Sequence, residues 1–263
     1  MDTRNEPSLL NRRAYFFARV IIFLFGSVAV AWGAYQFSLT RQQEPVQRAA
    51  SDLLKGRGFS SRTLTKLLSD SDSAAARAIC VPSELRSLVV LRIALLKSEI
   101  ADGKASVASA DASYVQLYQL AKAALECSPS DAYIWMTLFW LDASRHGLTP
   151  ENAKFLQMSY ESGSNEGWVA FGRVQVALSL LDRLPDRLSQ NVVDDFIKLL
   201  NTGVLYDDLA AVLVDEAPGV KTRVIRSLDA VGPSVRQKLS KALRDKDADV
   251  VIPGVQAPDR PWH

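Results

Sequence analysis

The stretch from Leu117 to Trp168 reads LYQLAKAALECSPSDAYIWMTLFWLDASRHGLTPENAKFLQMSYESGSNEGW, and it contains two segments that nearly repeat each other. The segment AALECSPSDAYIW ends one apolar helix, turns at Pro129 and Asp131, and begins another helix at Trp135. The segment QMSYESGSNEGW does the same and reaches Trp168, 33 residues after the first tryptophan. Self-similarity at a period of this length is typical of proteins built from stacked helical hairpins.

These two segments resemble the tetratricopeptide repeat. Ala124, Pro129 and Trp135 stand where that repeat has a small residue, its closing proline and the aromatic residue that opens the next helix. In the second unit Ala153 and Phe155 stand where the repeat has its packing pair, and Gly163 replaces the proline. The resemblance implies a domain of stacked antiparallel helices that bury their apolar faces against neighbouring helices and serve as a surface for protein–protein contact.

The composition narrows the possible functions. Of the 263 residues, 48% are hydrophobic and 23% are charged, which is enough apolar material for a core and too much for a disordered chain. The formal net charge is only +2, and the two signs are interspersed, so the chain lacks the concentrated basic face of a nucleic-acid-binding protein. His146 and His263 are the two histidines, which disfavours metal sites and general acid–base catalysis.

The N-terminal region predicts one membrane anchor over residues 14–37. Val20 to Phe37 contains no charged residue, and about 20 apolar residues span a bilayer core. Arg19 lies near one end, where its long side chain can reach the lipid headgroups. Two alternatives are a cleaved signal peptide, with Ala29-Val30-Ala31 as the cleavage site, and a buried core helix. The apolar run continues beyond that cleavage site and has no polar face, which favours the uncleaved anchor.

The charges that flank this anchor bear on its orientation. Four arginines lie before it or at its start, and two follow within about 15 residues, which favours an inside location for residues 1–13. Lys55 and Arg57 follow soon afterwards and weaken the bias. The arginines are Arg4, Arg12, Arg13 and Arg19 before the span, and Arg41 and Arg48 after it.

The rest of the chain predicts an all-α fold with about nine helices after the anchor. Helical spacing of apolar residues and Pro, Gly and Asp at the ends of each segment support this assignment. The basic residues of the last helices are interpreted as a solvated face, with a lipid or polysaccharide contact as the alternative. The expected parts are a polar stalk and short helices over 38–79, with Ser38–Ser51 as the stalk, a repeat domain over 80–183, packing and capping helices over 184–246, and an extended tail over 247–263.

The two cysteines predict a disulfide. Cys80 lies just before an expected helix over 82–100, and Cys127 ends an expected helix over 113–127. Two helices joined by a short loop usually pack antiparallel, which brings both cysteines to the open end of the hairpin. A disulfide persists only in an oxidising compartment, so it would agree with an outside location for the domain. The alternative is a pair of buried free thiols.

No motif in the sequence predicts catalysis or cofactor binding. The chain has no phosphate-binding glycine loop, no G-x-S-x-G and no C-x-x-C, and a nucleophilic pair of a cysteine with His146 has no supporting spacing. His146 is expected to interact with the negative end of its helix. The adjacent acids Asp194–Asp195 and Asp207–Asp208 point about 100° apart on a helix, so they are expected at the surface. No catalytic, cofactor-binding or metal residue is therefore predicted.

A group of aromatic residues is expected in the core of the repeat. Trp140 is the best candidate for exposure, because it lies about 140° around its helix from Trp135. Alternatively, the group lines a sugar- or peptide-binding groove together with a carboxylate such as Glu151 or Glu166. The residues are Trp135, Phe139, Trp140, Tyr160 and Trp168.

The chain as a whole resembles small membrane-anchored, repeat-like proteins of alphaproteobacteria, and the resemblance runs from the anchor through Glu126–Phe171 to the terminal Arg-Pro-Trp. Some of these proteins resemble products of exopolysaccharide gene clusters. The resemblance implies a single-pass protein of the bacterial inner membrane with a cytoplasmic N-terminus and a periplasmic domain. Its expected function is that of a non-catalytic scaffold without a cofactor, which binds other envelope proteins and assists polysaccharide assembly or export. The alternative is an envelope carbohydrate-binding protein or enzyme.

Overall fold

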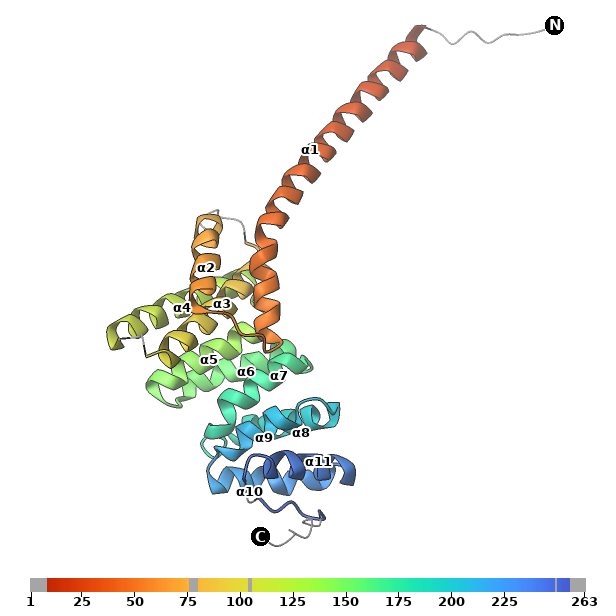
Figure 1. The fold of residues 1–263 in the computed structure, drawn as a ribbon. Helices are drawn as coiled ribbons and strands as arrows, with labels where there is room; N and C mark the ends of the chain where they lie inside the picture. Colours follow the sequence, from red (N-terminus) through yellow and green to blue (C-terminus); the bar gives the residue numbers. More distant parts are fainter. Residues whose placement is uncertain (1–8, 76–79, 104–105, 249, 256–263) are drawn as a thin grey trace, which may run out of the picture.

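The computed structural model describes residues 9–75, 80–103, 106–248 and 250–255 (Figure 1). Helices and short connections make up these residues, and none of them forms a strand. The all-α prediction is confirmed. One long helix projects from a stack of shorter helices, which runs from α2, α3 and α4 beside this helix to α10 and α11 at the far end (Figure 1).

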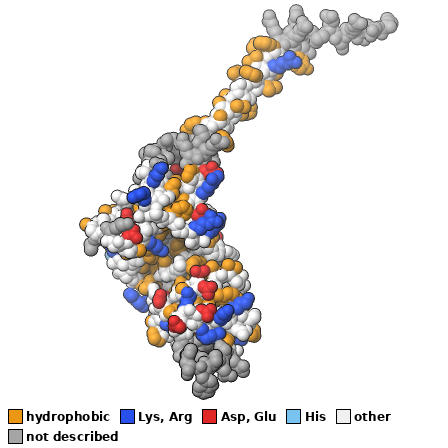
Figure 2. Space-filling view, in the orientation of Figure 1, with side chains coloured by type: hydrophobic (Ala, Val, Ile, Leu, Met, Phe, Trp, Pro, Cys, Tyr) orange, Lys and Arg blue, Asp and Glu red, His pale blue; other side chains and the backbone are white. Residues whose placement is uncertain are grey.

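The projecting helix is α1 (Leu9–Leu54), and it contains the candidate membrane span. Residues Tyr15–Tyr35 are long and apolar enough to cross a membrane, and none of this stretch is buried within the protein. Figure 2 shows hydrophobic side chains along the projecting part and charged side chains over the stacked helices. At 46 residues, the helix is about 69 Å long.

The prediction of a polar stalk over Ser38–Ser51 is wrong, because α1 continues through these residues without a break. Pro45 lies inside the helix and is exposed to solvent. The last turns of α1 pack on α3, and this packing stabilises the helix despite the backbone hydrogen bond that proline removes. The residues in the packed stripe follow helical spacing: Val46, Ala49, Ala50 and Leu53.

The helices from α2 to α7 form the upper part of the stack. Asp131 begins α5 by accepting hydrogen bonds from two backbone N–H groups, and Thr149 begins α6 through a reciprocal capping box with Asn152. Helix α2 ends at Ala75, and residues 76–79 lie outside the described chain. The bounds are α2 (Ser61–Ala75), α3 (Pro82–Ala101), α4 (Val107–Cys127), α5 (Ala132–His146), α6 (Pro150–Gly163), α7 (Gly167–Ala177) and a 3-10 helix (Leu178–Leu180).

The helices from α8 to α11 form the lower part. Gly203 ends α8 in the left-handed conformation, with a φ of 78°, which glycine adopts without strain. Of the expected tail, residues 250–255 lie against α11: Ile252 is buried, and Arg236 donates from Nη1 to the carbonyl oxygen of Pro253 at 3.0 Å. Residues 256–263 lie outside the described chain. The bounds are α8 (Asp186–Thr202), α9 (Tyr206–Val214), α10 (Pro218–Ser227), a 3-10 helix (Leu228–Ala230) and α11 (Pro233–Arg244).

Helix α5 belongs to two hydrophobic cores. Ile134 and Leu138 pack in the upper core with residues from the end of α1 to α4. Phe139, on another side of α5, packs in the lower core with residues of α6 to α11. This double burial accounts for the apolar residues on more than one face of α5, since each face meets a different set of helices.

Candidate functional site

The five aromatic residues expected to share a core or a groove lie in different environments. Phe139 is completely buried in the lower core. Trp135 is half-buried, its ring lies 6.0 Å from that of Phe155, and its Nε1 donates to the carbonyl oxygen of Pro129 at 2.7 Å. Tyr160 is buried beside α7 and α8. No single groove collects these side chains.

Trp140 was expected to be more exposed than Trp168, but the structure shows the opposite. Trp140 is half-buried, and the Lys97 ammonium lies 5.7 Å from its ring centroid. Trp168 is 37% exposed, so its predicted place in the repeat core is wrong. Helix α7 begins at Gly167, and its apolar stripe starts only at Val169, which leaves Trp168 on the solvent side of the first turn.

Trp168 lies in a surface formed by three helices. Its ring is 5.1 Å from that of Tyr133 on α5, and the Arg86 guanidinium from α3 lies 5.8 Å from its centroid. Aromatic pairs and cation–π contacts at these distances are attractive. We name these three residues, Arg86, Tyr133 and Trp168, the Arg86–Trp168 surface.

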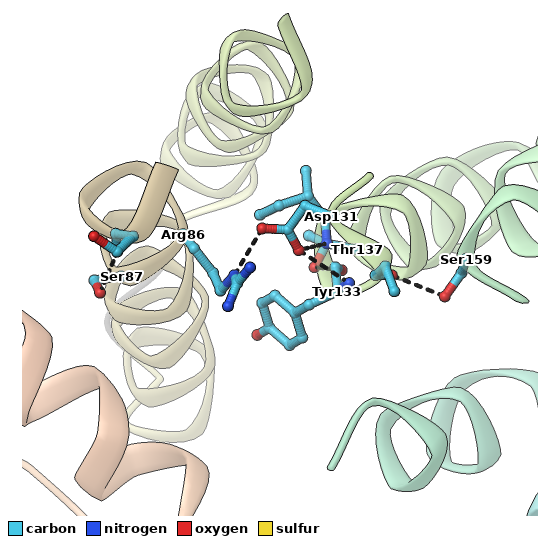
Figure 3. Close-up of polar contacts among 9 residues, drawn as sticks. Arg86, Ser87, Asp131, Tyr133, Thr137 and Ser159 are labelled. Carbon is cyan, nitrogen blue, oxygen red and sulfur yellow. Dashed lines mark hydrogen bonds and ion pairs between the residues drawn. The ribbon is translucent and has the colours of Figure 1, made fainter. Parts of the chain in front are cut away.

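Asp131 fixes the position of Arg86 in this surface (Figure 3). One carboxylate oxygen of Asp131 accepts from Arg86 Nε at 2.6 Å, and the other accepts from the backbone N–H groups of Tyr133 and Ile134 at 3.1 and 3.2 Å. Asp131 is buried, whereas the Arg86 side chain is 38% exposed. Burial raises the pKa of the Tyr133 phenol, so its hydroxyl remains protonated even in alkaline solution. The cap of α5 thus presents a cation beside two aromatic rings.

A second polar group is buried between α6, α7 and α8. Arg173 on α7 is completely buried, and its Nε donates to Asp195 Oδ2 on α8 at 2.8 Å. Its Nη1 lies within 3.3 Å of the backbone and hydroxyl oxygens of Ser159 and 3.2 Å from the carbonyl oxygen of Gly163. Ser159 in turn donates to the carbonyl oxygen of Ala132 on α5 at 2.8 Å. Four helices are therefore joined through one guanidinium group.

The buried ion pair between Arg173 and Asp195 was not predicted from the sequence, and it contradicts the expected surface position of Asp195. Asp194 is exposed as expected, but Asp195 is 1% exposed and the expectation that both are surface residues is wrong. The helical spacing of the sequence does indicate that both charged residues are buried. Arg173 lies within the apolar stripe of α7, and Asp195 lies three residues after Val192 in that of α8. Charged residues in such stripes indicate a buried pair.

A groove with a volume of about 660 Å³ lies between α6 and α8. Its lining includes the buried residues Tyr160 and Asp195 and the cationic residues Lys154, Arg187 and Lys198. Glu151 and Glu166, the carboxylates considered for an aromatic groove, are both exposed, and neither lines this one. Of the five aromatic residues considered for a groove, Tyr160 lines this one, without either of the two carboxylates.

The structure joins Cys80 and Cys127 in a disulfide, with their Cα atoms 5.5 Å apart. The bridge connects Cys80, two residues before the start of α3, to the last residue of α4, and it leaves neither thiol available for a nucleophilic pair with His146. His146 lies in the last turn of α5, with Nδ1 3.0 Å from Asp142 Oδ1. Within the described ranges, no group of three or more His, Cys, Asp or Glu side chains could hold a metal ion.

Comparison with known proteins identifies no family for the chain. No family model matches it, and neither a curated protein nor a solved structure matches it at a significant level. The features that bear on its function are therefore those of its own surface.

Proposed function

We propose that this chain is a membrane-anchored, non-catalytic scaffold that holds another envelope protein close to the bacterial inner membrane. The observation that carries the proposal is the continuity of α1, which joins an exposed apolar span to a packed helical domain. A partner captured by a tethered domain has a higher effective concentration at the membrane, without any additional contact.

The proposed topology has residues 1–13 in the cytoplasm and the helical domain in the periplasm. The arginines before the span support this orientation. The Cys80–Cys127 bridge supports it independently, because structural disulfides are stable in the periplasm and rare in the cytosol. Together these features favour a partner in the envelope.

The Arg86–Trp168 surface is the proposed contact for this partner. Trp, Tyr and Arg are the residue types that most often dominate the energy of protein interfaces. Asp131 holds Arg86 in position through a short ion pair, so little side-chain entropy remains to be lost on binding. Trp168 offers an exposed ring that a partner can cover.

Site-specific photo-crosslinking in living cells tests this proposal. A photoreactive amino acid replaces Trp168 in one variant, and Val204 or Val251 in two control variants, since both valines are exposed and far from this surface in sequence. We expect one discrete adduct from position 168 that weakens when Arg86→Ala is added. Equal adducts from all three positions, or none from 168, would remove the support for this surface.

We further propose that the scaffold assists polysaccharide assembly or export, as the overall resemblance implies. The expected result of deleting the gene is a loss of secreted polysaccharide that the full chain restores. The chain with Trp168→Ala should restore less, because it lacks the proposed partner contact. Unchanged secretion after deletion would reject this role and leave the scaffold proposal to the crosslinking experiment.

A further inference from the structure

The Cys80–Cys127 bridge joins the two chain segments that carry the ion pair of the Arg86–Trp168 surface. Cys80 lies two residues before α3, and Arg86 is the fifth residue of that helix. Cys127 ends α4, and Asp131 follows it by four residues as the cap of α5. The covalent bond and the ion pair between Arg86 and Asp131 therefore connect the same two short segments.

The segment from Cys127 to Asp131 is held firmly by noncovalent contacts. Asp131 is buried and accepts hydrogen bonds from two backbone N–H groups of α5, at 3.1 and 3.2 Å. Trp135 Nε1 donates to the carbonyl oxygen of Pro129, in the middle of the segment, at 2.7 Å. Ala124, in the last turn of α4, is buried in the upper core. The turn between α4 and α5 therefore keeps its position without help from the bridge.

The start of α3 is held much less firmly. Val81, which precedes the helix, gives no side-chain hydrogen bond to its first N–H groups. Residues 82–86 are exposed or half-buried, and Ser87 is the first buried residue of the helix. Gln47 Nε2 lies 3.3 Å from Ser83 Oγ, which is long for a hydrogen bond. Helix ends with few buried contacts open most easily, so the bridge is the strongest restraint on these turns.

We propose that the Cys80–Cys127 disulfide is a redox switch for the Arg86–Trp168 surface. With the bridge closed, the first turns of α3 are held against the turn between α4 and α5, and the Arg86 guanidinium stays 5.8 Å from the Trp168 ring centroid. With the two thiols reduced, these turns fray, and Arg86 moves away from Asp131 and from the ring. The inference rests on the proposed function, because it concerns the regulation of the same partner contact.

The switch closes by thiol–disulfide exchange with an oxidant that itself contains a disulfide. The Cys80 and Cys127 thiols lose two electrons and two protons and form the S–S bond, and the disulfide of the oxidant is cleaved to two thiols. A dithiol reductant reverses both changes. Cys80 is exposed, so either reagent can reach the bridge. Because the cytosol keeps thiols reduced, the surface is complete only after the domain has reached an oxidising compartment.

Hydrogen exchange of the full chain in detergent micelles tests the switch without a partner. The backbone N–H groups of residues 84–87 are bonded within the first turns of α3. We expect dithiothreitol to speed their exchange by about tenfold or more, within a labelling time in which α6 stays protected. The chain with Cys80→Ser and Cys127→Ser should exchange fast there with or without reductant. Unchanged exchange over 84–87 in the reduced chain would overturn the proposal. Simultaneous loss of protection in α6 would also overturn it, because the bridge would then hold the whole domain.

Photo-crosslinking from position 168 in isolated membranes tests whether the switch controls the partner contact. Dithiothreitol should weaken the adduct of the oxidised chain to the level that Arg86→Ala gives, and it should have no further effect on the Arg86→Ala chain. The chain with Cys80→Ser and Cys127→Ser is the matched control: its adduct should be weak and unchanged by the reductant, which excludes an effect of the reductant on the partner. An adduct of equal intensity before and after reduction would overturn the proposal. Absence of any adduct from the oxidised chain would instead contradict the proposed function, and hydrogen exchange would still decide whether the bridge holds the start of α3.

Discussion

Arg173 of α7 and Asp195 of α8 form an ion pair from which solvent is excluded, with Nε 2.8 Å from Oδ2 and side-chain exposures of 0% and 2%. The pair lies next to the lower core and connects to α5 and α6 through Ser159 and Gly163. Removing one member of a buried pair leaves an uncompensated charge, which is more damaging than replacing both members by apolar residues.

Asp195→Ala should therefore lower the free energy of unfolding by about 3–5 kcal/mol. Asp194→Ala, at the neighbouring exposed position, is the control and should change it by less than about 1 kcal/mol. The double variant Arg173→Met, Asp195→Leu should be more stable than Asp195→Ala alone. Urea unfolding of the full chain in detergent measures all three. Equal effects at positions 194 and 195 would contradict the burial of the pair.

Two glycines test the packing of α5 against its neighbours. A Cβ atom on Gly163 would lie 2.7 Å from the Cβ of Ala132, which is held by the backbone and cannot move aside. A Cβ atom on Gly172 would lie 2.5 Å from Met136 Sδ, and a methionine side chain can adopt another rotamer. Gly163→Ala should destabilise the protein by about 1–3 kcal/mol. Gly172→Ala should be close to neutral, since alanine also favours the helix by about 1 kcal/mol. A larger loss for Gly172→Ala, measured by thermal unfolding, would contradict this reading of the contacts.

The different environments of Phe139 and Trp168 predict different costs of truncation. Phe139→Ala should lower the free energy of unfolding by about 3–5 kcal/mol, because it opens a cavity in the lower core. Trp168→Ala should lower it less, by about 1–2 kcal/mol, because the residue is already 37% exposed and its ring contacts Tyr133 and Arg86 at the surface. Chemical denaturation distinguishes the two results. Similar large losses for both variants would place Trp168 in the core after all.

The hydrophobic pattern predicted most helices within a few residues, because caps and helix-ending residues such as Asp131 and Gly203 act locally. The errors arose where tertiary contacts decide. A proline and polar residues suggested a break after the span, yet packing on α3 keeps α1 continuous through Pro45. The exposure of Trp168 and the burial of Asp195 depend on neighbouring helices, which spacing within one helix does not identify. The groove between α6 and α8 joins residues about 40 positions apart, such as Lys154 and Asp195, so no local motif could indicate it.

The bridge between Cys80 and Cys127 should contribute measurably to stability. It closes a loop with a sequence separation of 47, for which chain entropy gives about 3–4 kcal/mol. Dithiothreitol should therefore lower the unfolding temperature of the wild type and leave the Cys80→Ala, Cys127→Ala variant unchanged. Identical unfolding temperatures of the wild type with and without reductant would contradict a stabilising bridge.

The topology of the full chain and the state of its two thiols test the central claim together. Spheroplasts that express the chain are treated with protease from outside, and Cys80 and Cys127 are labelled with a maleimide mass tag before and after reduction. A periplasmic domain anchored by α1 predicts digestion from outside and labelling only after reduction. Protection from protease together with labelling before reduction would contradict it, because it would place the domain in the cytoplasm with free thiols.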